Sequence, residues 1–97
     1  VLFRSRPCCI VSELLFDEED LVLDGIVRWL LPDGALFREA TRFILERRND
    51  RVRLRILGED HPARIIGTSR DGYELAFETP IPQETVVEWV DRYLTEE

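Results

Sequence analysis

The clearest pattern in this chain is an alternation of apolar and basic residues between Arg51 and Ile56. Every second position there is Val, Leu or Ile, and the positions between them are arginine. Successive side chains of a β-strand point to opposite faces, so this period of two places the apolar residues on one face and the arginines on the other. The pattern predicts a half-buried strand.

The segments that follow predict an antiparallel meander. Gly58–His61 has the composition of a turn, and Ala63–Thr68 is suited to a return strand. The sequence Arg70–Gly72 is typical of a hairpin turn and leads into a third alternating segment. The residues that we expect on one buried face of that segment are Tyr73, Leu75 and Phe77.

A helix is expected near the C-terminus, from about Gln83 to Leu94. Pro82 marks its start, and Glu84 lies in the first turn, where a carboxylate is favourable. The apolar residues that recur at helical spacing are Val86, Trp89, Val90, Tyr93 and Leu94. An isolated helix of this length is marginal in water, so we expect this stripe to pack against the strands.

The first half of the chain is more ambiguous. Pro7–Phe16 is apolar and short enough for a strand, and the acidic run Asp17–Asp20 follows it as a turn. The apolar spacing of Leu21–Leu31 fits a helix or a strand, but Gly25 and its β-branched neighbours favour the strand. Ala35–Arg48 has the same ambiguity, and we expect a strand there, followed by a helical turn.

The segment Gly25–Phe37 predicts a strand, a tight turn at Pro32–Gly34 and a second strand. In the first strand we expect Val27, Trp29 and Leu31 to point to one side. Trp29 would then belong to the core. The alternative is that its indole forms a platform on which a base stacks.

Composition narrows the classes of function. The 97 residues suffice for one small domain, and no apolar run is long enough to cross a membrane. The net charge of −7 disfavours nucleic acid as a partner, because phosphate binding relies on a clustered positive field. Cys8 and Cys9 are adjacent and form neither a zinc pattern nor a disulfide framework, so we expect a reducing cytoplasm and no cofactor.

The chain begins with a peptide, Val1–Ser5, that the end of a common sequencing adapter would encode in one reading frame. We therefore expect residues 1–5 to be a non-native leader and the domain to comprise residues 6–97. No repeat or linker interrupts those residues.

No catalytic constellation is visible, and an enzyme is the function that we favour least. The single histidine, His61, is expected to be an exposed turn residue without a nucleophile beside it. The acidic run near residue 20 lacks the ligand spacing of a calcium loop, and we expect no metal site.

A stripe of arginines could bind an anion or could be a solvated face of the sheet. Its members are Arg47, Arg48, Arg51, Arg53, Arg55 and Arg64. Glu74 and Glu78 are expected on the outer face of the next strand, where they could pair with these arginines across the sheet. We therefore favour the solvated face.

The hairpin segment resembles the central signature of PilZ domains, in which the pattern Asp/Asn-x-Ser-x-x-Gly follows a glycine that opens the strand. Gly25 and Gly34 stand where the glycines of that family stand, whereas Trp29 replaces the acidic or amide residue and Leu31 replaces the serine. The order of the predicted strands and the closing helix extends the resemblance over nearly the whole chain.

This resemblance implies a mainly β fold, a small six-stranded antiparallel β-barrel with a C-terminal helix, and cyclic di-GMP as the ligand. The second ligand motif of the family, Arg-x-x-x-Arg, lies just before the first strand. Arg6 matches its second arginine, but the first would fall at Leu2. The resemblance therefore implies Arg6 and Gly34 as ligand-binding residues, with nucleotide binding weakened or lost.

Three hypotheses follow. The first is a PilZ-like regulatory domain in bacterial cyclic di-GMP signalling, whose partners would be the nucleotide and a protein. The second is a nucleotide-independent protein-interaction module of the same fold. The third is an unrelated small α+β domain, which would require Leu21–Leu31 and Ala35–Arg48 to be helical.

Overall fold

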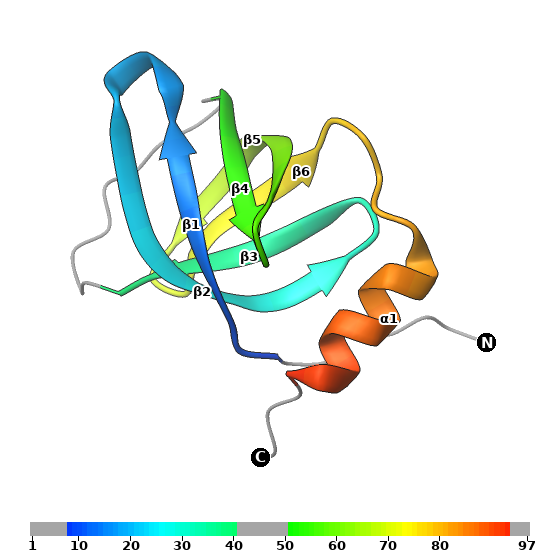
Figure 1. Ribbon diagram of the computed structural model, residues 1–97. Coiled ribbons are helices and arrows are strands. Elements are labelled where there is room, and N and C mark those ends of the chain that lie inside the picture. Colours follow the sequence, from blue (N-terminus) through cyan, green and yellow to red (C-terminus); the bar gives the residue numbers. More distant parts are fainter. Residues whose placement is uncertain (1–7, 41–50, 94–97) are drawn as a thin grey trace.

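The chain folds into a closed β-barrel with one helix across its end (Figure 1), as seen in a computed structural model that describes residues 8–40 and 51–93. All neighbouring strands are antiparallel, and their order around the barrel is β1-β2-β3-β6-β5-β4. The elements are β1 (Ile10–Phe16), β2 (Leu21–Leu31), β3 (Gly34–Glu39), β4 (Arg51–Ile56), β5 (Glu59–Ser69), β6 (Gly72–Phe77) and α1 (Gln83–Arg92).

The predicted strands are confirmed where the structure describes them. In β4 the apolar residues are buried and the arginines face outward, as the alternation requires. Leu21–Leu31 is a strand, which excludes the α+β alternative. Of Ala35–Arg48, the first part forms β3, whereas the expected helical turn lies outside the described residues. A short 3-10 helix, Asp17–Glu19, makes the acidic turn between β1 and β2.

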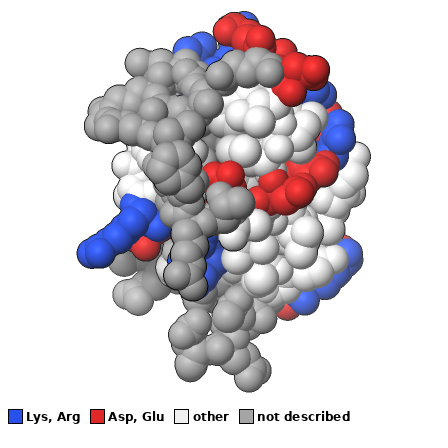
Figure 2. Space-filling model, turned by 90° about the vertical axis from the view of Figure 1, so that its left-hand side faces the viewer, with Lys and Arg blue, Asp and Glu red and all other residues white. Residues whose placement is uncertain are grey.

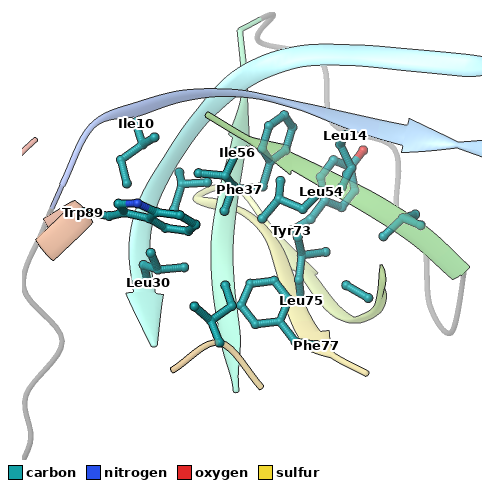
Figure 3. Packing of buried hydrophobic residues seen from close by; sticks show 14 of the residues in the cluster. Ile10, Leu14, Leu30, Phe37, Leu54, Ile56, Tyr73, Leu75, Phe77 and Trp89 are labelled. Atoms are coloured by element: carbon teal, nitrogen blue, oxygen red, sulfur yellow. The ribbon is translucent and has the colours of Figure 1, made fainter. Parts of the chain in front are cut away.

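The core fills the barrel with apolar side chains from all six strands (Figure 3). Phe37 and Tyr73, from the adjacent strands β3 and β6, are among its largest fully buried side chains. Trp89 enters from α1 and lies beside Ile10 and Leu30 at one end of this cluster. The helix therefore completes the core at an open end of the barrel.

Two backbone hydrogen bonds tie the helical region to the strands. The Ile81 N–H donates to the Pro32 carbonyl at 2.8 Å, before the helix begins, and the Cys9 N–H donates to the Tyr93 carbonyl at 3.0 Å, after it ends. The expected stripe is confirmed, with Val86, Trp89 and Val90 buried and Tyr93 packed against the core. Leu94 lies outside the described residues. Within the described part of the chain, neither the 3-10 helix nor α1 is long enough to cross a membrane.

The expectation for His61 was wrong. The chain reverses at Leu57 and Gly58, both with positive φ, so β5 already begins at Glu59 and His61 lies within the strand. Its ring centroid is 6.0 Å from that of Phe77 and 5.9 Å from that of Trp89. The tight turn thus moves this residue from a loop into the contact between barrel and helix.

Candidate functional site

A β-bulge in β2 reorients the residues of the hairpin signature. Val27 pairs with Phe37, but the next pair is Trp29 with Leu36, so Arg28 is an extra residue on this strand. Because a bulge shifts the alternation by one residue, Val27 faces the core whereas Trp29 faces the outer surface. The prediction that Val27 and Trp29 share one side was therefore wrong, and Trp29 is not a core residue.

A second bulge lies in β5, on the other side of β3 and β6. The pairing with β6 shifts between Ile65 and Gly67, so Ile66 is the extra residue. Ile65 is fully buried, while Ile66 is 56% exposed. The bulge in β2 therefore turns a large apolar side chain to the outer surface, whereas Ile66 faces outward because it follows the buried Ile65.

These side chains line a groove, called here the hairpin groove, with a volume of about 530 Å³. Its residues are Trp29, Leu31, Asp33–Leu36, Ile66, Ser69, Asp71 and Glu74–Ala76. They come from β2, β3, β5, β6 and the two turns that join β2 to β3 and β5 to β6. The groove therefore brings together residues from both halves of the chain.

Gly34 allows β3 and β6 to approach closely where they line this groove. It begins β3 directly after the turn, and a Cβ placed on it would overlap the carbonyl oxygen of Leu75 in β6. A side chain at this position would force the two strands apart, so glycine is required by the close approach of the backbones. Gly34 pairs with Leu31 of β2 on one side and with Ala76 of β6 on the other. Gly34 therefore places no side chain between these two residues.

The charges that line the groove are acidic. Asp33, Asp71 and Glu74 are exposed, and the described lining residues include no arginine or histidine. No ion pair joins these three carboxylates to a cation among residues 8–40 and 51–93. The groove consequently combines apolar side chains, called here its apolar floor, with these three carboxylates, called here its acidic rim; Glu74 lies between Leu36 and Gly67 in the sheet.

The arginines of β4, by contrast, are paired with carboxylates. Arg53 contacts Asp17 at 2.7 Å and Asp60 at 2.6 Å, and Arg55 contacts the other oxygen of Asp60 at 2.6 Å. Hydrogen bonding from Arg55, reinforced by the charges of both arginines, lowers the pKa of Asp60 below its ordinary value. Arg55 also lies 3.6 Å from Glu13.

These pairs favour the solvated face over an anion-binding stripe, because neighbouring carboxylates already neutralise the guanidinium groups. Of the two expected glutamate partners, Glu78 is confirmed, at 3.6 Å from Arg51, whereas Glu74 lines the hairpin groove. Arg47 and Arg48 lie outside the described residues. Figure 2 shows one side of the barrel, where acidic side chains lie within an otherwise uncharged surface and most basic side chains lie toward the edges of the view.

A second hollow, of about 680 Å³, lies over β1, β2, β3 and the end of β4. It is lined by charges of both signs, among them Glu13, Asp24, Arg38 and Arg55. Trp29, Leu31 and Gly34 of the hairpin signature do not border it. We therefore take the hairpin groove as the candidate site.

A metal site or a reactive thiol would require a particular arrangement of the described residues. Within residues 8–40 and 51–93, no three His, Cys, Asp or Glu side chains gather as metal ligands would. Burial raises the pKa of the Cys8 thiol to about 11, and this thiol donates a hydrogen bond to the Val27 carbonyl. Cys9 is exposed.

The fold thus brings together some of the residues that the sequence singled out for the site. Trp29, Leu31 and Gly34 line one groove, while Arg6 lies outside the described residues. The sequence reasoning missed Ile66 and Asp71, which join the groove through strand pairing far along the chain. The short apolar pair at residues 65 and 66, which breaks the alternation before a glycine, was the available signal for the second bulge.

No family model and no curated protein matches the chain. Among solved structures, the chain is similar to the crystal structure of the PilZ domain of CeSA from a cellulose-synthesizing bacterium. The two share 20% sequence identity with a TM-score of 0.66, and the match covers 93% of this chain and 97% of the other. The likeness shows that the chain has the PilZ fold, as the strand order and the hairpin signature predicted.

Proposed function

We propose that this chain, with its PilZ fold, is a non-enzymatic regulatory domain of bacterial cyclic di-GMP signalling in which nucleotide binding is weakened or lost. The fold, shared with the PilZ domain of CeSA, supports a binding domain. The free thiols of Cys8 and Cys9 are consistent with a reducing cytoplasm, where we place it.

The chemistry of the hairpin groove carries this proposal. A dinucleotide with two phosphates and two guanines requires arginine forks and short polar groups at the barrel surface. At the two positions where the PilZ signature has Asp/Asn and Ser, the groove has Trp29 and Leu31, and its rim is acidic. This combination repels phosphate and offers the guanine edge no carboxylate or hydroxyl from these positions.

The expected loss of affinity is large. Each charge-assisted hydrogen bond contributes roughly 1.5–3 kcal/mol, so the loss of two weakens binding by about 3–6 kcal/mol. That corresponds to a factor of about 10² to 10⁴ in Kd, which moves a micromolar site into the range of about 0.1–10 mM.

The direct test is calorimetric titration of the chain with cyclic di-GMP. We expect no saturable heat from the unmodified protein. A restored variant, with Leu2→Arg, Trp29→Asp and Leu31→Ser, regains both motifs together with Arg6 and is expected to bind. A matched control carries Leu2→Arg with Val22→Asp and Val11→Ser, which introduce the same three residue types, the aspartate and serine at exposed strand positions outside the groove.

Low-micromolar binding by the unmodified chain would contradict the proposal. A restored variant that folds, as judged by circular dichroism, and still gives no heat would show that residues 29 and 31 do not correspond to the ligand positions of the PilZ signature. Equal binding by the restored variant and the control would lead to the same conclusion.

A second candidate function is a nucleotide-independent protein-interaction module of the same fold. The observation that favours it is the exposed apolar side chain of Ile66 in the same groove as the outward-facing Trp29. Large apolar side chains that gather on an outer surface are characteristic of interaction sites.

A further inference from the structure

We infer that the hairpin groove binds a segment of a partner protein that carries one or two large apolar side chains next to arginine or lysine. This inference rests on the proposed function, because it takes the groove to have lost its nucleotide chemistry. It adds the chemical class of the occupant and the residues that recognise it.

The first argument is the apolar floor. Trp29 pairs with Leu36 across β2 and β3, and Leu31 lies further along the same strand. Ile66 lines the same groove from β5, which β3 and β6 separate from β2, and is 56% exposed. Tryptophan in a groove of this kind commonly supplies much of the binding energy at protein interfaces, because it buries a large area with few rotatable bonds.

The bulge in β2 contributes to this floor. Without the extra residue at Arg28, Trp29 would point into the barrel. Ile66 faces outward by regular alternation after the buried Ile65. Bulges lower the regularity of a sheet and often reorient side chains at functional positions. Here the bulge in β2 presents Trp29 to the groove that Ile66 also lines.

The second argument is the charge of the rim. The carboxylates of Asp33, Asp71 and Glu74 lie among the apolar side chains of the groove and have no cationic partner in the described part of the chain. Asp60, in contrast, is held by two arginines. Complementary charges accelerate association and select partners, so an acidic rim favours a cationic segment and disfavours an acidic one.

The third argument concerns the mode of binding. The barrel is closed, so its strands present no open edge to which a partner could add a strand. Recognition must therefore use side chains on the outer face of the sheet. A volume of about 530 Å³ is within the usual range of roughly 300–1,000 Å³ for a ligand pocket, and it suits a short segment with few anchors.

A random dodecapeptide library displayed on phage supplies the probe. The immobilised chain selects peptides, and the most enriched peptide is synthesised with a fluorescent label for anisotropy titrations. We expect the enriched peptides to combine Trp, Phe or Leu with neighbouring Arg or Lys. Their affinity should fall as salt rises from 50 to 500 mM, because screening weakens the contacts with the rim.

Two groove variants and one control then locate the contact. Ile66→Glu places a charge on the apolar floor, and the double variant Asp71→Arg with Glu74→Arg reverses part of the rim. Each is expected to raise Kd at least tenfold. The control, Glu18→Arg with Glu84→Arg, changes the net charge as much as the double variant at exposed positions outside the groove, and its Kd should stay within about twofold of the parent.

The inference is overturned if the selection yields no peptide whose binding depends on Ile66 or the rim. It is also overturned if the selected peptides are acidic, or if the control weakens binding as much as the double rim variant. All variants are checked for folding by circular dichroism.

These outcomes can be separated from a failure of the proposed function. A chain that binds neither peptide nor cyclic di-GMP overturns the inference and leaves the loss of nucleotide binding intact. A chain that binds cyclic di-GMP with low-micromolar affinity, and releases the peptide when nucleotide is added, overturns the proposed loss of nucleotide binding while the peptide contact stands.

Discussion

The substitution Val90→Asp tests whether the closing helix is part of the barrel core. Val90 is 4% exposed and belongs to the core cluster. Val87, one turn earlier on the same helix, is 38% exposed. The same substitution at residue 87 is therefore a matched control, since it changes the charge, the side-chain size and the helix propensity equally.

The expected cost follows from burial. Valine at a fully buried position contributes about 1.5–3 kcal/mol, and this contribution is lost in the variant. The new carboxylate must then either be buried without a partner or pull the helix away from the barrel. We expect a net loss of about 2–4 kcal/mol, a large part of the roughly 5–15 kcal/mol that stabilises a domain of 97 residues.

Urea unfolding at pH 7, followed by circular dichroism, measures this loss. With a slope of about 1.5 kcal/mol per molar urea, a loss of 3 kcal/mol lowers the midpoint by about 2 M. The Val87→Asp control is expected to change stability by less than about 0.5 kcal/mol. Equal midpoints for the two variants would refute the reasoning, because the helix would then be a tail that does not support the core.

The pH dependence of the same variant provides an independent check. Burial raises the pKa of a carboxyl in the folded state, so the folded protein binds a proton more readily than the unfolded chain. The deficit of Val90→Asp relative to the parent should therefore be smaller at pH 4 than at pH 7. A deficit that does not depend on pH would mean that the carboxylate escapes to water.

Two further predictions concern charge and thiols. The pKa of Asp60 is lowered in the folded state, so its ion pairs stabilise the protein at pH values above the ordinary pKa of 3.8, and this stabilisation is lost as the pH falls through the lowered pKa. Asp60→Asn should therefore reduce the urea midpoint more at pH 7 than at pH 3. Equal reductions at the two pH values would contradict this prediction. Ellman's reagent at pH 8 should react rapidly with the exposed thiol of Cys9. The buried thiol of Cys8, whose pKa is raised to about 11, should react only in denaturant. Rapid reaction of both thiols in the folded protein would contradict the burial of Cys8.

Local periodicity was sufficient to predict most of the elements. The alternation in β4, the apolar face of β6 and the stripe of α1 each reflect burial on one side of a regular element, and such a pattern can be read without knowing the partner. The turn at Pro32–Gly34 and the resemblance of its flanking strands to the PilZ signature were then enough for the barrel fold.

The outward positions of Trp29 and Ile66, the location of His61 and the hairpin groove itself were decided only by the tertiary structure. A bulge adds one residue to one strand of a pair, so its position depends on the register against the partner strand, which the strand's own sequence does not contain. The groove likewise requires β3 to pair with β6, which joins distant parts of the chain. Such non-local pairing brings Gly34 against the backbone carbonyl of Leu75. It also gathers the apolar and the acidic side chains of the hairpin groove in one place.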